Sequence, residues 1–183
     1  STGSGGSATE VMAFRVIEAA GLDKDKDMTR ERLGVAESVS ALKDRKIDAF
    51  FWVGGLPTGA VTDLANTPGV KIRMVDIAHL VPAMTKKYGN IYIKDVIPKD
   101  VYKGMEADNQ AATVTNLLAV HKDMHEDLAY KITKAVFDHR EDLIRVHKEA
   151  TNIKLENQKV EASSIPWHPA AIKYFGEKGI KLK

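Results

Sequence analysis

The chain has 183 residues, 44% of them hydrophobic, so it can bury a core and does not have the composition of a disordered protein. Its 27 basic and 25 acidic residues leave a net charge of +2, with no basic stripe interleaved with aromatic residues, which argues against a nucleic-acid partner. It has no cysteine and therefore no disulfide or thiolate metal site. No apolar run is long enough to cross a membrane, so we expect a protein that is not membrane-embedded.

The chain begins with a glycine-rich loop, residues 3–7, that runs into an apolar helical pattern ending near Gly21. A helix start presents N–H groups without intrahelical partners and carries a partial positive charge. Ser7 and Thr9 add hydroxyl donors to these N–H groups. The loop therefore suits a carboxylate or phosphate, although a simple helix cap made by Ser7 or Thr9 explains the same residues.

A loop of this kind normally follows a strand. Only Ser1 and Thr2 precede it here. We therefore expect that sequence is missing on the N-terminal side and that this chain is the C-terminal part of a larger protein.

The rest of the chain alternates apolar strand patterns with helical ones. We expect strands at 33–36, 47–53, 71–77, 91–97 and 111–120, and helices at 37–46, 58–64, 79–88, 126–147 and 170–178. The polar stretch 152–162 reads as a loop with a short helix. Because the run 47–53 is uninterruptedly apolar, it is typical of a strand buried on both faces of a parallel sheet. The order of the elements predicts an α/β fold with parallel-rich sheets flanked by helices.

A second glycine-rich loop, residues 54–58, follows the run 47–53 and enters the next helix, with Pro57 suited to its first turn. In a parallel sheet both glycine-rich loops lie at the carboxyl ends of strands, where open α/β folds bind their ligands. Two helix starts directed at one spot would hold an anion without any charged side chain.

The sequence contains one partial enzyme signature as an alternative to this binding site. The spacing of Gly3, Gly5 and Ala8 matches the dinucleotide fingerprint, so a nucleotide-binding enzyme is an alternative, but no strand precedes it and no acidic residue clearly ends the next strand. Ser7 is not in a nucleophile elbow, because Thr9 stands where that motif has glycine. We expect no catalytic residues and no cofactor.

His121 and His125 are four residues apart, a spacing that can bring two metal ligands together on a helix. They straddle an expected strand end and a helix start, however, and no third ligand is evident. We therefore expect no metal site there.

With these segments placed, the chain resembles the TAXI family of TRAP-transporter solute-binding proteins over nearly its whole length. The motifs that carry the resemblance are, in chain order, Gly6-Ser7-Ala8-Thr9-Glu10 and residues 38–51, 53–58, 97–104, 117–137 and 165–171. Ala8, Arg45 and Ala170 stand where the family pattern has glycine. Each motif is loose by itself, and the ordered set is what is specific.

The resemblance implies a periplasmic binding protein of the type II, two-lobed kind, with the N-terminal part missing from this chain. Residues 1–76 would form most of the second lobe, and residues 77–183 would cross back to complete the first lobe. Such a protein captures a small organic anion, a glutamate-like amino acid or a dicarboxylate, and delivers it to the membrane subunits of a TRAP transporter. A ligand-sensing domain of a receptor is an alternative, because type II lobes also serve receptors.

The resemblance also implies a ligand site on the two loops. Its candidate residues are Gly6, Ser7, Ala8, Thr9, Gly54, Gly55, Pro57 and Thr58. Ser7 and Thr9 would donate hydrogen bonds to a ligand carboxylate, and Ala8 would add a methyl group where the backbone meets the ligand. Tyr92, from the crossing region, is a further candidate to face the cleft, with packing in the core as the alternative.

Overall fold

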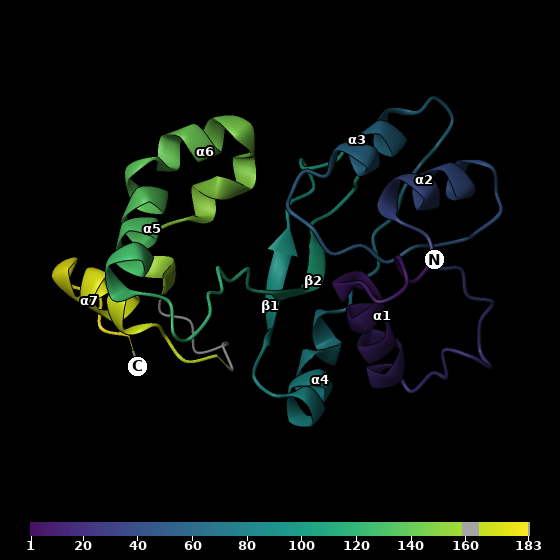
Figure 1. Cartoon of the computed structure of the whole chain (residues 1–183). Coiled ribbons are helices and arrows are strands. Elements are labelled where there is room, and N and C mark those ends of the chain that lie inside the picture. Colours follow the sequence, from purple (N-terminus) through teal and green to yellow (C-terminus); the bar gives the residue numbers. More distant parts are fainter. Residues whose placement is uncertain (159–164, 183) are drawn as a thin grey trace. The chain divides into compact units, whose positions relative to one another are not determined.

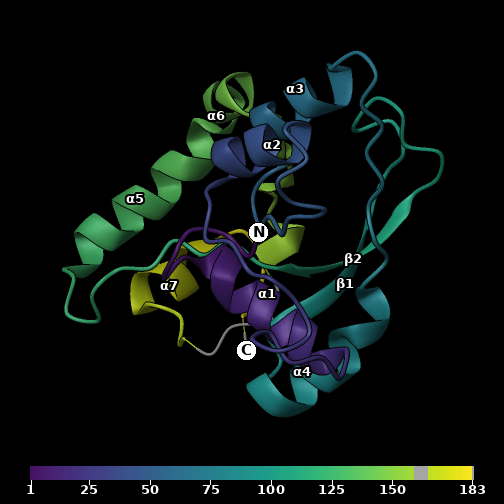
Figure 2. The same ribbon diagram turned by 90° about the vertical axis from the view of Figure 1, so that its right-hand side faces the viewer.

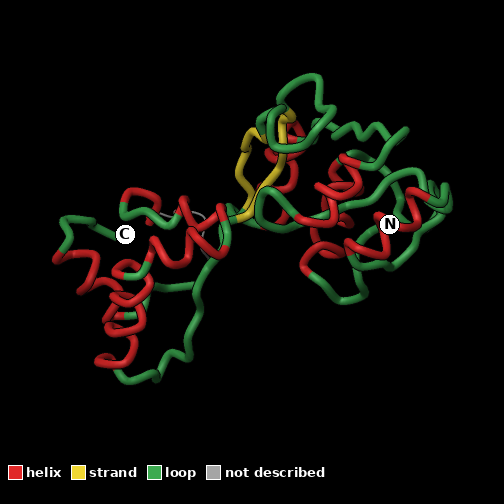
Figure 3. The backbone as a smooth tube through the Cα atoms, turned by 90° about the horizontal axis from the view of Figure 1, so that it is seen from above, coloured by secondary structure: helices red, strands yellow, loops and turns green. Residues whose placement is uncertain are grey.

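The computed structural model describes residues 1–158 and 165–182. The chain divides into two compact units, Ser1–Thr113 and Val114–Lys183, each of which is described by itself. Helices are the main regular structure, and two neighbouring strands form a small sheet (Figures 1 and 3). The boundary expected after residue 76 was a boundary between the two lobes of a binding protein, and it stays a prediction.

The first unit contains four α-helices, a short 3-10 helix and the sheet. In chain order these are α1 (Ala8–Ala19), α2 (Val35–Lys43), α3 (Gly59–Asn66), η1 (Ala78–Leu80), α4 (Val81–Tyr88), β1 (Tyr92–Ile97) and β2 (Asn109–Val114). The helices expected at the N-terminus and at 58–64 and 79–88 are confirmed, as is the strand expected at 91–97. The helix expected at 37–46 is also present but begins at Val35, so the strand expected at 33–36 was wrong.

The core of the first unit lies where α1 and α4 pack side by side (Figures 1 and 2). From α1 it takes an apolar face at helical spacing that includes Met12, Val16 and Ile17, all less than a tenth exposed. Met84 of α4 is fully buried. A second cluster brings Val61 and Ala65 of α3 together with Tyr102.

The expected parallel sheet is not formed by the described residues. Segments 47–53 and 71–77 have no strand assignment, and the strand expected at 111–120 covers only Asn109–Val114. The apolar run 47–53 is not buried on both faces, because Trp52 is 39% exposed. The reason is that a strand needs a ladder of partners, and the recorded backbone partner of this segment is Ser1.

The second unit is helical. Its elements are α5 (Glu126–Asp138), α6 (Arg140–Val146), the 3-10 turns η2 (Lys148–Asn152) and η3 (Glu156–Gln158), and α7 (Pro169–Glu177). The helix expected at 170–178 is confirmed. Within the polar stretch 152–162, η3 is the short helix, and residues 159–162 lie outside the described part of the chain.

The single helix expected at 126–147 is two helices. His139 ends α5 and begins α6, with backbone angles of −105° and 22° that leave the helical region. The apolar stripe continues across this break, which explains why periodicity alone did not reveal it. α5 packs on α7 through an aromatic cluster in which Tyr174 lies 5.6 Å from Tyr130 and 5.7 Å from Phe137, measured between ring centroids.

Candidate functional site

The first glycine-rich loop ends in a capped helix. The Ser7 side-chain oxygen accepts a hydrogen bond from the Glu10 N–H (3.1 Å), and the Glu10 carboxylate accepts one from the Gly6 N–H (2.8 Å). This exchange resembles the capping box. It differs in that the glutamate carboxylate accepts from the N–H of the residue before the N-cap, and not from that of the N-cap residue itself. The capping interpretation of Ser7 is therefore confirmed. Its hydroxyl proton has no acceptor within residues 1–158 and 165–182, so Ser7 can cap the helix and still donate to a ligand.

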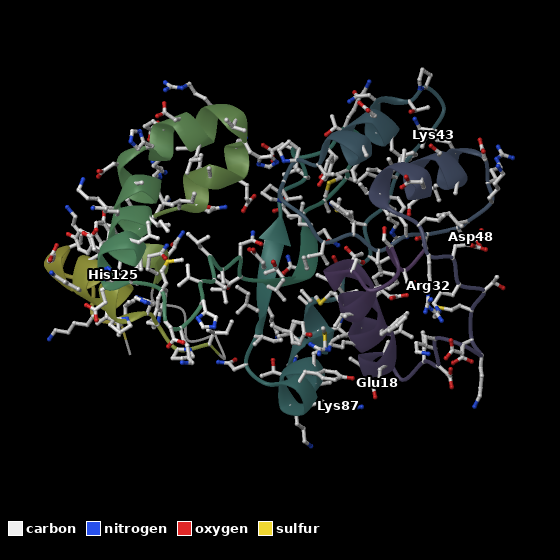
Figure 4. All side chains as sticks on the ribbon, in the orientation of Figure 1. Glu18, Arg32, Lys43, Asp48, Lys87 and His125 are labelled. Carbon is white, nitrogen blue, oxygen red and sulfur yellow. The ribbon has the colours of Figure 1, made fainter. Side chains whose placement is uncertain are left out.

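The Glu10 carboxylate is a buried charge with arginine partners. Glu10 is 6% exposed, and its carboxylate lies 2.9 Å from Nε of Arg32 and 3.4 Å from the Arg30 guanidinium. Arg30 also pairs with Asp25 at 3.0 Å. Figure 4 shows Arg32 beside α1. The carboxylate thus meets the partial positive charge of the helix start from inside the protein.

Gly3 and Thr9 make the closest approach in this loop. Gly3 has a φ of +93°, and a Cβ there would lie 2.7 Å from the Thr9 side chain, so only glycine fits. Thr9 is 5% exposed, and neither its N–H nor its hydroxyl has an acceptor among the described residues. The N–H of Ala8, in the first turn of α1, is likewise unpaired there. The described residues therefore leave these donors without a partner.

The second loop is held by Trp52 and Tyr102. The Trp52 indole N–H donates to the Thr58 hydroxyl (2.7 Å), and this hydroxyl donates to the Gly55 carbonyl (2.8 Å). The Thr58 N–H donates to the Tyr102 hydroxyl (2.8 Å). A Cβ on Gly54 would lie 2.6 Å from the Trp52 ring, so this glycine is needed for close packing of the indole.

Both donors of Thr58 are therefore used within the protein. The donors that α3 leaves available are the N–H groups of Gly59 and Ala60, which have no acceptor in the part of the chain described. Pro57 follows a cis peptide bond and precedes the helix rather than lying in its first turn. Thr58 is the N-cap residue of α3 but makes no side-chain capping bond.

Hydrogen bonds to Ser1 set the two loops in register. The Ser1 nitrogen donates to the Ala49 carbonyl (2.6 Å), and the Phe51 N–H donates to the Ser1 carbonyl (2.9 Å). In a parallel pair of segments, one residue bonds to the two residues on either side of the residue opposite it. Ser1 bonds in this way to the residues on either side of Phe50, so the two segments run in the same direction. Gly3 follows Ser1 by two residues and Gly54 follows Phe50 by four. The two loops therefore leave this pair on the same side.

Tyr92 is buried and bonded to α1. It is 3% exposed, and its hydroxyl accepts a hydrogen bond from Arg15, near the middle of α1. The same guanidinium lies 4.3 Å from the ring centroid of Tyr88 and 5.8 Å from that of Tyr92. Among the described residues, no recorded hydrogen bond joins Tyr92 to either loop, so its assignment to the ligand site stays a prediction.

The paired histidines have structural roles. Nδ1 of His121 accepts the Asp123 N–H (3.2 Å), and Nδ1 of His125 accepts the Asp127 N–H (3.3 Å) at the start of α5, where Figure 4 labels His125. No group of three or more histidine or acidic residues is placed to hold a metal ion within the described ranges.

A family model for NMT1-like proteins matches residues 1–179. The chain belongs to the NMT1-like family. This family is part of the periplasmic binding protein-like superfamily and indicates a solute-binding protein. The family implies a periplasmic-binding-protein-like fold, to which the helices and small sheet described above contribute.

The match covers both glycine-rich loops of this NMT1-like chain and all of its described helices. In the described residues, no helix has the length and apolar character needed to span a bilayer.

Four residues that hold the two loops were not predicted to do so. They are Glu10, which was quoted only as part of a family motif, and Arg32, Trp52 and Tyr102. For Glu10 a signal existed, because Ser7-x-x-Glu10 has the spacing of a capping box. For Tyr102, 44 residues from its partner Thr58, no local pattern could have shown the contact.

Proposed function

We propose that this NMT1-like protein is the extracytoplasmic solute-binding subunit of a TRAP-type transporter. It binds a small organic anion, a glutamate-like amino acid or a dicarboxylate, and delivers it to a membrane permease from the periplasm. It has no catalytic role. The family match supports the solute-binding part of this proposal, and the resemblance to TAXI proteins is what suggests the transporter and the ligand class.

The observation that carries the proposal is the register of Ser1 against Phe50. Because these residues run in parallel, the starts of α1 and α3 follow on the same side of the pair. Each helix start presents N–H groups without acceptors among the described residues, Ala8 and Thr9 on one helix and Gly59 on the other. Two positive helix ends on one side can each take one carboxylate of a dicarboxylic ligand.

The first carboxylate would lie against α1. The donors there are the N–H groups of Ala8 and Thr9, the Thr9 hydroxyl and the free proton of Ser7. The Gly6 N–H is not available, since it donates to Glu10. Glu10 therefore shapes this half of the site without contacting the ligand.

The test is calorimetric titration of the chain with glutamate, succinate and 2-oxoglutarate, with NAD as the arm for the alternative enzyme. We expect saturable binding of one carboxylate. Thr9→Val preserves the shape that packs against Gly3 and removes one hydroxyl donor to an ionised group, which should weaken binding about tenfold or more. Thr67→Val is the matched control, because this hydroxyl donates to the Asp63 carbonyl at the far end of α3.

Binding of NAD and of no carboxylate would favour the nucleotide-binding alternative. Equal weakening by Thr9→Val and Thr67→Val would remove Thr9 from the site. Co-purification with TRAP membrane subunits, compared between ligand-loaded and ligand-free protein, separates a transporter subunit from a receptor domain.

A further inference from the structure

The second unit contains a cavity, open to solvent, that the loop site does not use. It has a volume of about 520 Å³ and lies among the end of α5, the segment 153–156 and the end of α7. Its apolar lining consists of the rings of Phe137 and Tyr174 and the side chains of Ile153 and Leu155. This lining suits an apolar body, and the volume exceeds that of a single aromatic ring.

Tyr174 contributes a hydroxyl donor to this cavity. The residue is 3% exposed, packed edge-on against Tyr130 and Phe175. Its hydroxyl has no hydrogen-bond partner among the described residues, and it is not sealed from solvent. Burial raises the pKa of Tyr174 above its usual value, so the group stays an O–H donor at neutral pH. Because this hydroxyl reaches solvent at the cavity, an acceptor bound there can take its proton in place of water.

The charges around the cavity favour an anion. Lys154 and Lys178 both line it, and in the described part of the chain neither lies within ion-pair distance of a carboxylate, although Lys178 acts electrostatically on Asp138. The Lys178 ammonium lies 5.8 Å from the ring centroid of Tyr174. Asp138, also on the lining, is already paired with Lys134.

The other charged residues of the lining determine how many negative charges a bound ligand can carry. Arg140 lines the cavity but donates to the carbonyl groups of Ile153 (2.7 Å) and Thr151 (2.8 Å) and pairs with Glu141. Glu156 is a lining carboxylate with no cationic partner among the described residues. The lining carries three cations (Arg140, Lys154 and Lys178) and two carboxylates (Asp138 and Glu156), and this net charge of +1 favours a ligand with one negative charge over one with two.

We propose that this cavity binds a small monocarboxylate with an aromatic or other apolar body. The carboxylate lies between Lys154 and Lys178 and accepts the Tyr174 hydroxyl proton, and the apolar body lies against Phe137. This site is separate from the two glycine-rich loops and does not depend on their proposed function.

The test is titration of the full chain with benzoate, followed residue by residue by amide NMR. Benzyl alcohol is the neutral comparison and phthalate the dianionic one. We expect saturable benzoate shifts at residues 153–156 and at the end of α7, with weaker binding of the other two compounds. Tyr174→Phe and Lys178→Gln should each weaken benzoate about tenfold, the effect of losing one hydrogen bond to an ionised group.

Two variants on the same elements serve as matched controls. Lys173→Gln removes a charge from α7, and Tyr130→Phe removes a hydroxyl from the aromatic cluster, but neither residue lines the cavity. Thr9→Val, which tests the loop site, should leave benzoate binding unchanged.

Absence of benzoate shifts at the cavity in protein with a folded spectrum would overturn the proposal. So would benzoate affinity that Tyr174→Phe and Lys178→Gln leave unchanged. Lys178 is exposed, so Lys178→Gln keeps the test decisive if Tyr174→Phe disturbs folding.

Discussion

The Glu10 carboxylate provides an internal negative charge at the start of α1. Its carboxylate accepts from the Gly6 N–H and pairs with Arg32 and Arg30, while Ser7 caps the helix from the other side. One consequence is that the loop keeps its shape whether or not an external anion is present. A ligand then meets donors that are already oriented.

Glu10→Gln should lower the free energy of unfolding by about 1–3 kcal/mol, because the ion pairs of a buried carboxylate with Arg32 and Arg30 are lost and its hydrogen bond with the Gly6 N–H is no longer charge-assisted. Urea denaturation measures the change. Glu37→Gln is the matched control, since Glu37 is also the third residue of its helix but is exposed. Equal stability of the two variants would contradict the structural role of Glu10.

At the scale of elements, α1 and α4 are joined by a polar contact as well as by their core. The Glu18 carboxylate accepts hydrogen bonds from the Lys87 ammonium and the Tyr88 hydroxyl, and Figure 4 shows Glu18 and Lys87 close together at the ends of the two helices. These bonds hold the pKa of Glu18 below its ordinary value of 4.5 and raise the pKa of Lys87 and of Tyr88.

A lowered carboxyl pKa makes this contact sensitive to acid. Its contribution to stability is complete above about pH 4.5, where Glu18 is ionised in the unfolded chain as well, and is lost as the pH falls through the lower pKa of the folded state. Glu18→Gln should therefore reduce the dependence of stability on pH below this value. Thermal unfolding from pH 5 to 3 measures it, and an unchanged slope would count against the contact.

The helices were more predictable than the strands. Helix starts and ends carry local signals, such as Ser7 before α1 and Gly179 after α7, and both helices were expected close to where they lie. A strand depends on partners distant in sequence. The run 47–53 has the composition of a buried strand, yet its side chains are partly exposed and its recorded backbone partner is Ser1.

The same contrast applies to the site. Both glycine-rich loops were recognised, because glycine followed by a helical pattern is a local signal. The hydrogen-bond partners that the protein itself provides for Gly6 and Thr58 were not recognised. For Thr58 the reason is that Tyr102 and Trp52 reach it only in the folded protein. The donors that are left available, such as Gly59, follow only from these contacts.

On the scale of the whole molecule, contacts concentrate within Ser1–Thr113 and within Val114–Lys183. Each unit contains one of the two tryptophans, Trp52 and Trp167. Fluorescence of single-tryptophan variants can therefore follow the unfolding of each unit separately.

Leu64→Ala should lower the stability of the first unit by about 2–5 kcal/mol, because Leu64 is fully buried and its truncation leaves a cavity. We expect the denaturation midpoint reported by Trp52 to fall and that reported by Trp167 to stay. Phe175→Ala, in the core of the second unit, should show the reverse. A single transition that both tryptophans report, shifted equally by either variant, would mean that the units unfold together.

The charge balance around Glu10 has a consequence for how ionic strength affects the loops. Glu10 and Asp25 offset Arg30 and Arg32, so the donors facing a ligand are backbone and hydroxyl groups beside a locally neutral network. Dissolved ions weaken attraction between exposed charges much more than they weaken short contacts with neutral donors. An anion held by these loops should therefore lose less affinity in sodium chloride than one held by exposed lysine or arginine side chains.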